Sequence, residues 1–181
     1  MTVFLSGGAK SGKSHLAQDI AVHLAASAPH YYVATLRPGG REDELRIKNH
    51  LADRAGLGFC TLERFESLDG TLPADAAQAT FLVDSVTSLL QNALFPPQRG
   101  YALDEEAGAR CIASLPAFAA QVRHAVFVSD NLFCDAVAYS ATTEAYRRQL
   151  AAADRRLAAF CDVVIEVVAG QPIFYKGRLS L

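Results

Sequence analysis

The chain has 181 residues, of which 51% are hydrophobic, and its formal net charge is −2. This length suits one well-buried α/β core and is short for two, so a single domain is expected. Because neither charge sign forms a long run, nothing indicates a nucleic-acid footprint or binding to an anionic membrane surface. The composition favours a small-molecule partner.

The compartment is indicated by cysteine usage and by the start of the chain. The four cysteines form no Cys-x-x-Cys pair, and the chain begins directly with a strand pattern instead of a charged leader. No stretch approaches the roughly 20 apolar residues that span a bilayer. We therefore expect a cytoplasmic protein without a membrane segment.

Apolar runs of strand length recur along the chain, with helical patterns between most of them. The strand runs are residues 2–6, 31–35, 80–83, 126–129 and 163–168. Helical patterns cover about residues 13–26, 42–55, 86–94, 104–122 and 142–160. A weaker run at 59–62 indicates a further strand, and 173–175, after a Gly-Gln-Pro turn, indicates an antiparallel edge hairpin. This alternation predicts a P-loop NTPase-type α/β fold, a mostly parallel sheet flanked by helices.

The first turn of the chain matches the phosphate-binding loop G-x-x-x-x-G-K-[ST]. Its residues are Gly7, Gly8, Ala9, Lys10, Ser11, Gly12, Lys13 and Ser14. Glycines let the backbone wrap close to phosphates, and the helix that follows presents its positive dipole end to the anion. Lys13 is expected to reach the β- and γ-phosphates and Ser14 to hold Mg²⁺, which predicts a nucleoside-triphosphate site. A chance glycine-rich turn is the alternative.

Three polar residues end apolar strands, namely Thr35, Asp84 and Asp130. Ligands gather at the carboxyl ends of strands in open parallel sheets, so these residues should face the same crevice as the phosphate loop. Asp84 is typical of a Walker-B carboxylate, which orders Mg²⁺ directly or through water. The alternative is that Asp84 only caps the following helix. For Asp130 both interpretations stay open.

His50 lies in the middle of a predicted helix, with Arg46 four residues before it and Arg54 four after. All three share one helix face, while Ile47 and Leu51 are expected to point to the core. Two guanidinium groups would disfavour the imidazolium form, which keeps His50 nucleophilic, and would offer forked donors to a phosphate. A solvated basic face with an incidental histidine is the alternative.

In their order along the chain, these motifs resemble the bifunctional adenosylcobinamide kinase/adenosylcobinamide-phosphate guanylyltransferase family of cobalamin biosynthesis. The phosphate loop is similar to the family's Gly-Gly-Ala-Arg-Ser-Gly-Lys-Ser sequence. Further matches are Tyr32-Val33-Ala34-Thr35, Arg46-Ile47-x-x-His50 with Arg54, Thr61-Leu62-Glu63, and Asp84-Ser85-Val86-Thr87 running on to Asn92 and Phe95. The resemblance covers most of the chain and is weaker from 151 to 168.

The chain departs from the family pattern in two places. The family carries Asn-Glu-Val-Gly-x-Gly-Ile-Val-Pro where residues 130–138 read Asp-Asn-Leu-Phe-Cys-Asp-Ala-Val-Ala. In a later segment it carries Phe-Arg-Asp and Asn-Gln where this chain has Tyr146-Arg147-Arg148 and Asp154-Arg155. Because Phe133 and Asp135 replace glycines, the backbone of this segment is expected to differ and any cleft there to be narrower.

The resemblance implies two reactions. GTP or ATP would phosphorylate the aminopropanol hydroxyl of adenosylcobinamide, with Lys13, Ser14 and Mg²⁺ neutralising the transferring group. His50, which the resemblance implies becomes guanylylated, would attack the α-phosphate of GTP and pass GMP to the cobinamide phosphate. The residues implied to contact the nucleotide are Ala34, Thr35, Leu36, Arg46, Leu51, Ala52, Asp53, Arg54, Glu63 and Asp84. The family also implies a homo-oligomer, a trimer with sites at subunit boundaries.

Two other functions stay open at this point. The first is a P-loop kinase of a small metabolite in which His50 only binds phosphate. The second is a non-catalytic nucleotide switch, which is disfavoured because no lysine is followed two places on by aspartate, as the guanine-reading N-K-x-D element requires.

Overall fold

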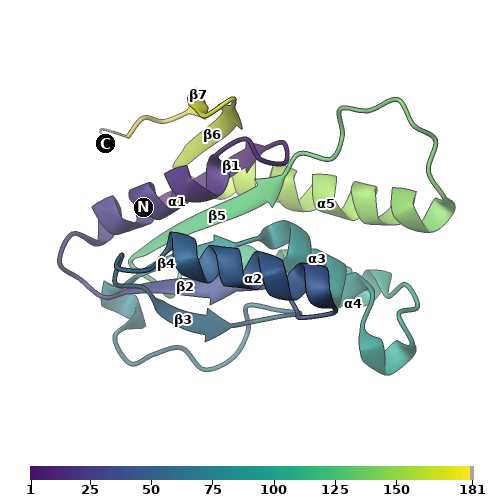
Figure 1. Ribbon diagram of the computed structural model, residues 1–181, viewed down its shortest axis with the longest axis horizontal. Helices are drawn as coiled ribbons and strands as arrows, with labels where there is room; N and C mark the ends of the chain where they lie inside the picture. Colours follow the sequence, from purple (N-terminus) through teal and green to yellow (C-terminus); the bar gives the residue numbers. More distant parts are fainter. Residues whose placement is uncertain (180–181) are drawn as a thin grey trace.

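The computed structural model describes residues 1–179 of the chain. Its centre is a seven-stranded sheet in the order β3-β2-β4-β5-β1-β6-β7 (Figure 1). The strands are β1 (Thr2–Gly7), β2 (His30–Ala34), β3 (Cys60–Glu63), β4 (Thr80–Asp84), β5 (His124–Asp130), β6 (Val163–Val168) and β7 (Gln171–Lys176). Strands β1 to β6 pair in parallel, and β7 pairs antiparallel with β6. The predicted P-loop-type sheet with an antiparallel edge is confirmed.

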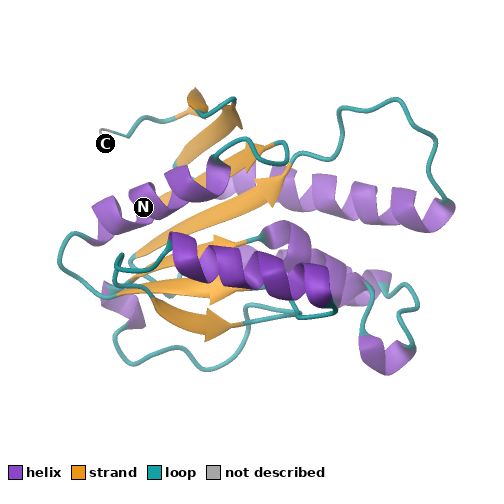
Figure 2. Ribbon diagram, in the orientation of Figure 1, coloured by secondary structure: helices purple, strands orange, loops and turns teal. Residues whose placement is uncertain are grey.

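The described part of the chain contains five α-helices (Figure 2). They are α1 (Lys13–Ala25), α2 (Arg41–Asp53), α3 (Val86–Leu94), α4 (Glu105–Ala119) and α5 (Ala141–Phe160), with 3₁₀ turns at Ala76–Gln78 and Pro97–Arg99. Each matches a predicted helix. The largest boundary error is at the end of α4, where Gln121 N–H donates to the Phe118 carbonyl at 3.0 Å and closes a tighter turn. Within residues 1–179 no helix is both long and apolar enough to cross a bilayer.

The central strands bury both faces, which explains their continuous apolar runs. Val3 and Leu5 of β1 pack with α1 on one face, whereas Phe4 joins the core on the opposite face. Leu82 of β4 and its neighbour Phe81 divide in the same way. Because successive side chains of a strand point to opposite faces, the sheet has a core on each face. Helices α3, α4 and α5 contribute to the core that contains Phe4 and Phe81.

Helix α2 differs from the other helices because it covers a cavity instead of the sheet. Ile47 and Leu51 were expected in the core, and this expectation was wrong. Leu51 is 50% exposed, Ile47 is half-buried, and both line the cavity described below. The helix has few apolar residues, and Leu45 is 58% exposed, so α2 has no apolar stripe that could bury against strands.

Candidate nucleotide-binding and catalytic site

The phosphate loop joins β1 to α1 and is shaped by close backbone contacts. A Cβ atom on Gly7 would lie 2.7 Å from both Ser11 Oγ and the Val167 carbonyl oxygen, so only glycine fits there. Gly12 has a φ of 93°, in the left-handed region that favours glycine. The turn between β6 and β7 supports the loop, because Gly170 N–H donates to the Ser11 carbonyl at 2.9 Å. The N-terminal loop is therefore tied to the C-terminal hairpin.

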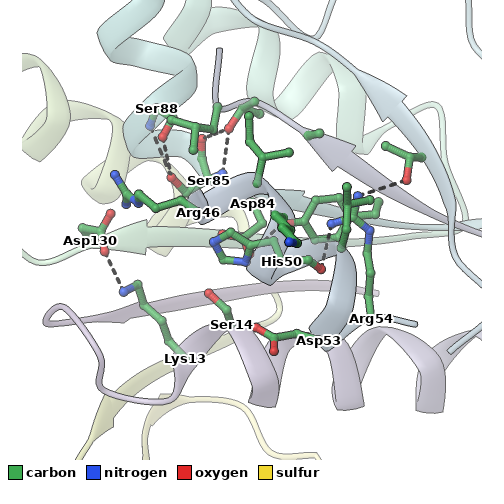
Figure 3. Close-up of a pocket in the computed structure, with 18 of the residues that line it drawn as sticks. Lys13, Ser14, Arg46, His50, Asp53, Arg54, Asp84, Ser85, Ser88 and Asp130 are labelled. Atoms are coloured by element: carbon green, nitrogen blue, oxygen red, sulfur yellow. Dashed lines mark hydrogen bonds and ion pairs between the residues drawn. The ribbon is translucent and has the colours of Figure 1, made fainter. Parts of the chain in front are cut away.

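The Lys13 side chain is held across the loop. Its Nζ lies 2.6 Å from Asp130 Oδ1 and donates to the Gly8 carbonyl at 3.2 Å (Figure 3). Lys13 is 7% exposed, whereas the Asp130 side chain keeps 25% of its exposure. The ammonium group thus lies over the loop that should receive phosphates.

A cavity of about 920 Å³ extends from the phosphate loop, under α2, to the carboxyl ends of β2, β3 and β4. The expected site residues that line it are Ala9, Lys10, Ser11, Gly12, Lys13, Ser14, Ala34, Thr35, Leu36, Arg46, His50, Leu51, Asp53, Arg54, Glu63 and Asp84. Gly7, Gly8 and Ala52 do not line it. Asp130, which also ends a strand, does. The three strand-end residues therefore face the phosphate loop, as the sheet topology predicts.

Asp84 lies at the centre of a small polar cluster. The Tyr32 hydroxyl donates to Asp84 Oδ2 at 3.1 Å. Burial raises the pKa of the Asp84 carboxyl, whereas the nearby His50 and the hydroxyl groups of Tyr32 and Ser14 oppose that shift (Figure 3). Asp84 does not cap α3, because the cap is Ser85, whose side chain accepts from Ser88 N–H at 3.2 Å. The carboxylate is thus available to the cavity.

The cavity end of Asp84 provides oxygen ligands that fit Mg²⁺. The Ser14 hydroxyl and the Asp84 carboxyl line the same cavity, and Ser14 acts to lower the pKa of Asp84. Hydroxyl and carboxylate oxygens are hard donors, and Mg²⁺ in nucleotide enzymes is held by one or two such groups together with phosphates.

His50 lies on α2, near Asp84, and lines the same cavity as Lys13 and Ser14 (Figure 3). Its Nδ1 atom is buried and has no hydrogen-bond partner among the described residues. A buried polar atom without a partner is rare and needs an explanation. An imidazole that binds a ligand in the cavity, instead of a protein group, would explain the missing partner.

Arg54 lines the cavity, but its guanidinium is engaged by neighbouring residues, so its expected role as a phosphate donor beside His50 stays a prediction. Its guanidinium stacks on the Tyr32 ring, 4.1 Å from the centroid, and donates to the His50 carbonyl at 3.0 Å and to Thr61 Oγ1 at 3.2 Å. The reason is that α2 ends at Asp53, so Arg54 leaves the helical face and turns toward the sheet. Arg54 is 8% exposed and anchors the end of α2.

Thr35 and Tyr32 also hold the cavity wall. The Thr35 hydroxyl accepts from Ser85 N–H and donates to the Ser85 carbonyl, both at 2.7 Å, and the residue is fully buried. It therefore fixes the turn after β4 instead of presenting a free hydroxyl. No role was predicted for Tyr32, although it is the first residue of a motif that matches the family. An aromatic residue in a strand usually indicates core packing, so nothing in the pattern pointed to its bond with Asp84.

This fold and site define a P-loop nucleotide-binding protein. Two solved structures share the fold: a Pyrococcus horikoshii OT3 protein (TM-score 0.52, 11% identity, 98% of this chain and 87% of that one) and a type III secretion system ATPase of pathogenic bacteria (TM-score 0.50, 18% identity, 91% and 50%). At these identities the likeness is one of fold.

The sequence comparisons identify the family. The model for cobinamide kinase / cobinamide phosphate guanyltransferase matches residues 3–174, and the chain belongs to this family. The bifunctional adenosylcobalamin biosynthesis protein CobP of Pseudomonas aeruginosa is 32% identical over 183 residues, 98% of this chain and 99% of that protein. CobU of Escherichia coli K12 is 32% identical over 96 residues, 52% of this chain and 51% of that protein. The protein is therefore an enzyme of this family.

Proposed function

We propose that the chain phosphorylates adenosylcobinamide with GTP or ATP and then transfers GMP from GTP to adenosylcobinamide phosphate through a guanylylated His50. The observation that carries this proposal is that the phosphate loop and His50 line one cavity of about 920 Å³. A triphosphate that lies along this cavity can have its terminal phosphates on the loop and its nucleoside end under α2. The two activities would then share one nucleotide pocket.

In the kinase step, the loop and Lys13 position the β- and γ-phosphates. Backbone N–H groups at the start of α1 face the anion, and the Lys13 ammonium neutralises charge on the transferring group. Ser14 and Asp84 would hold Mg²⁺, which would supply positive charge to stabilise the charge that develops on the phosphates. In-line attack by the acceptor hydroxyl then releases a nucleoside diphosphate.

In the guanylyl step, an imidazole nitrogen of His50 attacks the α-phosphorus of GTP. A phosphorus–nitrogen bond forms, the bond to the α–β bridging oxygen breaks, and pyrophosphate leaves. A phosphate oxygen of the cobinamide phosphate then attacks the same phosphorus, and His50 is released. The carboxylate of Asp84, next to the ring, suits a positive charge that develops on the imidazole.

Labelling with nucleotide tests the covalent step. After incubation with α-labelled GTP and Mg²⁺, we expect acid-labile label on the protein and one added GMP in the intact mass. His50→Ala should abolish both and keep γ-phosphoryl transfer to adenosylcobinamide. The matched control is His23→Ala, an exposed α1 residue that does not line the cavity, and it should be labelled normally.

Other outcomes separate the alternatives. Label that survives His50→Ala would contradict the nucleophile. Phosphoryl transfer without any protein label would instead support a P-loop kinase that lacks the guanylyl step. Nucleotide hydrolysis that no acceptor accelerates would support a switch.

The proposal includes a homo-oligomer, which the family resemblance makes a trimer. Leu45 and Leu51 of α2 are 58% and 50% exposed, and exposed leucines on a cavity-covering helix suit a subunit boundary. Light scattering should give three copies, and Leu45→Glu should lower that number. A monomeric wild-type protein would contradict this part.

A further inference from the structure

A second cavity adjoins the first on the side of α3 and α5. Its volume is about 650 Å³. Thr87, Gln91 and Asn92 of α3 and Tyr146 of α5 contribute to its walls, together with the loop that follows β2. The residues common to both cavities are Leu36, Pro38, Arg46, Ser88 and Asp130. The two cavities therefore meet at these side chains.

The walls of the second cavity suit an uncharged polar molecule with a large ring system. Amide and hydroxyl side chains alternate with the rings of Phe95, Tyr101 and Tyr146. Among the described lining residues only Arg37 and Arg46 are cationic, and Arg37 pairs with Glu66 at 2.6 Å. Gly39 lines the second cavity just before the N-terminus of α2, but the described lining has no lysine and includes the carboxylates of Asp43 and Asp130, so it is poorly suited to a second polyphosphate. Amide-bearing alcohols fit it better.

Asp130 occupies the junction between the cavities. It ends β5, next to Gly7 of the phosphate loop in the parallel register. Its backbone N–H donates to Thr87 Oγ1 at 2.8 Å, which fixes the position of the residue, and its Oδ1 lies 2.6 Å from Lys13 Nζ. Among the described side chains it is the one carboxylate that lines both cavities, because Asp84 lines only the first.

We propose that the second cavity binds the acceptor alcohol of the kinase step and that Asp130 is the catalytic base for this alcohol. The inference rests on the proposed kinase function and adds the acceptor site and a catalytic residue to it. Phosphoryl transfer is roughly in line, so the hydroxyl must approach the γ-phosphorus from the side opposite the leaving nucleotide. Lys13 should contact the γ-phosphate. Asp130 is paired with the Lys13 ammonium group, so its carboxylate lies on the side from which the hydroxyl approaches.

The proposed step balances as follows. The acceptor oxygen attacks the γ-phosphorus while its proton moves to an Asp130 carboxylate oxygen. The bond between the γ-phosphorus and the β–γ bridging oxygen breaks, and the nucleoside diphosphate leaves with that electron pair. Asp130 then returns its proton to water. A positioned base of this kind contributes about 10²- to 10⁴-fold to a rate.

The test uses Asp130→Asn in the full chain, because asparagine keeps the shape and the backbone bond to Thr87. With adenosylcobinamide, Mg²⁺ and γ-labelled nucleotide, kcat for phosphoryl transfer should fall by about 10²-fold or more. The KM for nucleotide and the labelling of His50 by α-labelled GTP should stay near wild type, as should GMP transfer to adenosylcobinamide phosphate supplied ready-made.

A second variant examines the acceptor cavity independently. Gln91 is exposed on α3 and lines only the second cavity, so Gln91→Ala should not affect folding. The KM for the acceptor should rise about fivefold, as loss of one hydrogen bond of about 1 kcal/mol implies, without a change in the KM for nucleotide.

Several results would overturn the inference. Wild-type kcat in Asp130→Asn would exclude a base at this position. An equal loss of phosphoryl transfer and His50 labelling would show that Asp130 only positions Lys13, and recovery at high Mg²⁺ would reassign it to the metal. If the wild-type protein phosphorylates no corrinoid alcohol, the proposed function itself fails. If the wild type and Asp130→Asn are both active, only the inference about Asp130 fails.

Discussion

Replacing Arg54 with alanine should detach the C-terminal end of α2, because this side chain joins the helix to the sheet. The perturbation removes a guanidinium that lies 4.1 Å from the Tyr32 ring centroid and donates to the His50 carbonyl and to Thr61 Oγ1. A desolvated cation–π contact contributes about 2 kcal/mol. The two hydrogen bonds add about 0.5 kcal/mol each, at the low end of the usual range, because both acceptors can regain water. The local loss is then about 3 kcal/mol, or about 100-fold in the docked population.

Hydrogen exchange and labelling measure this loss separately. Amides in the last turn of α2 should lose up to about 100-fold in protection, while those of β4 and β5 stay protected. Guanylylation of His50 should fall more than phosphoryl transfer, because Lys13 and the phosphate loop are untouched. Arg54→Lys should be intermediate, since lysine keeps the charge and loses the fork.

The matched control is Arg41→Ala, which removes an exposed arginine from the start of the same helix. It should leave both readouts unchanged. Wild-type protection of α2 together with a wild-type guanylylation rate in Arg54→Ala would refute the anchoring argument.

Two further predictions concern stability. Gly7→Ala should lower the free energy of unfolding by about 1–3 kcal/mol and abolish nucleotide binding, because the new Cβ would lie 2.7 Å from the Val167 carbonyl oxygen. Gly8→Ala should melt like wild type, because no atom lies within 4 Å of the position of its Cβ. Equal melting temperatures for the two variants would contradict this. Burial raises the pKa of Asp154 from 3.8 to about 6, so the folded state holds the carboxyl proton more tightly than the unfolded state does. The stability that this proton contributes is present below about pH 4 and is lost as the pH rises through about 6. Asp154→Asn should therefore raise the free energy of unfolding at pH 8 by up to ~3 kcal/mol and change it little at pH 4, as urea titrations would measure, and an equal change at both values would disprove the assignment.

The elements that sequence predicted well are those with a strong local signal. The strand runs are apolar on both faces, and the phosphate loop combines a strict spacing with a strand before it and a helix after it. Gly7 and Gly12 are needed for reasons of backbone geometry alone, which local sequence expresses directly. These features require no knowledge of distant neighbours.

What the sequence could not provide depends on tertiary neighbours. Apolar runs do not indicate that β5 lies between β4 and β1 in the sheet. This strand order brings Asp130 next to Lys13. Helical spacing put Arg54 on the face of His50, but the helix ends one residue earlier, and the side chain turns to Tyr32. The second cavity forms where the loop after β2 meets α3 and α5, and no single segment carries a signal for it.

The place of β1 in the sheet has a consequence for how the protein matures on the ribosome. The phosphate loop is synthesised before β5 and β6, but β1 pairs with both of these strands, and the loop itself bonds to Gly170. A nascent chain released before the last strands would hold the complete nucleotide motif without the walls that shape it. Affinity for triphosphate should thus emerge only after β5, β6 and the turn at Gly170 have been synthesised, which keeps chains that lack these segments from sequestering nucleotide.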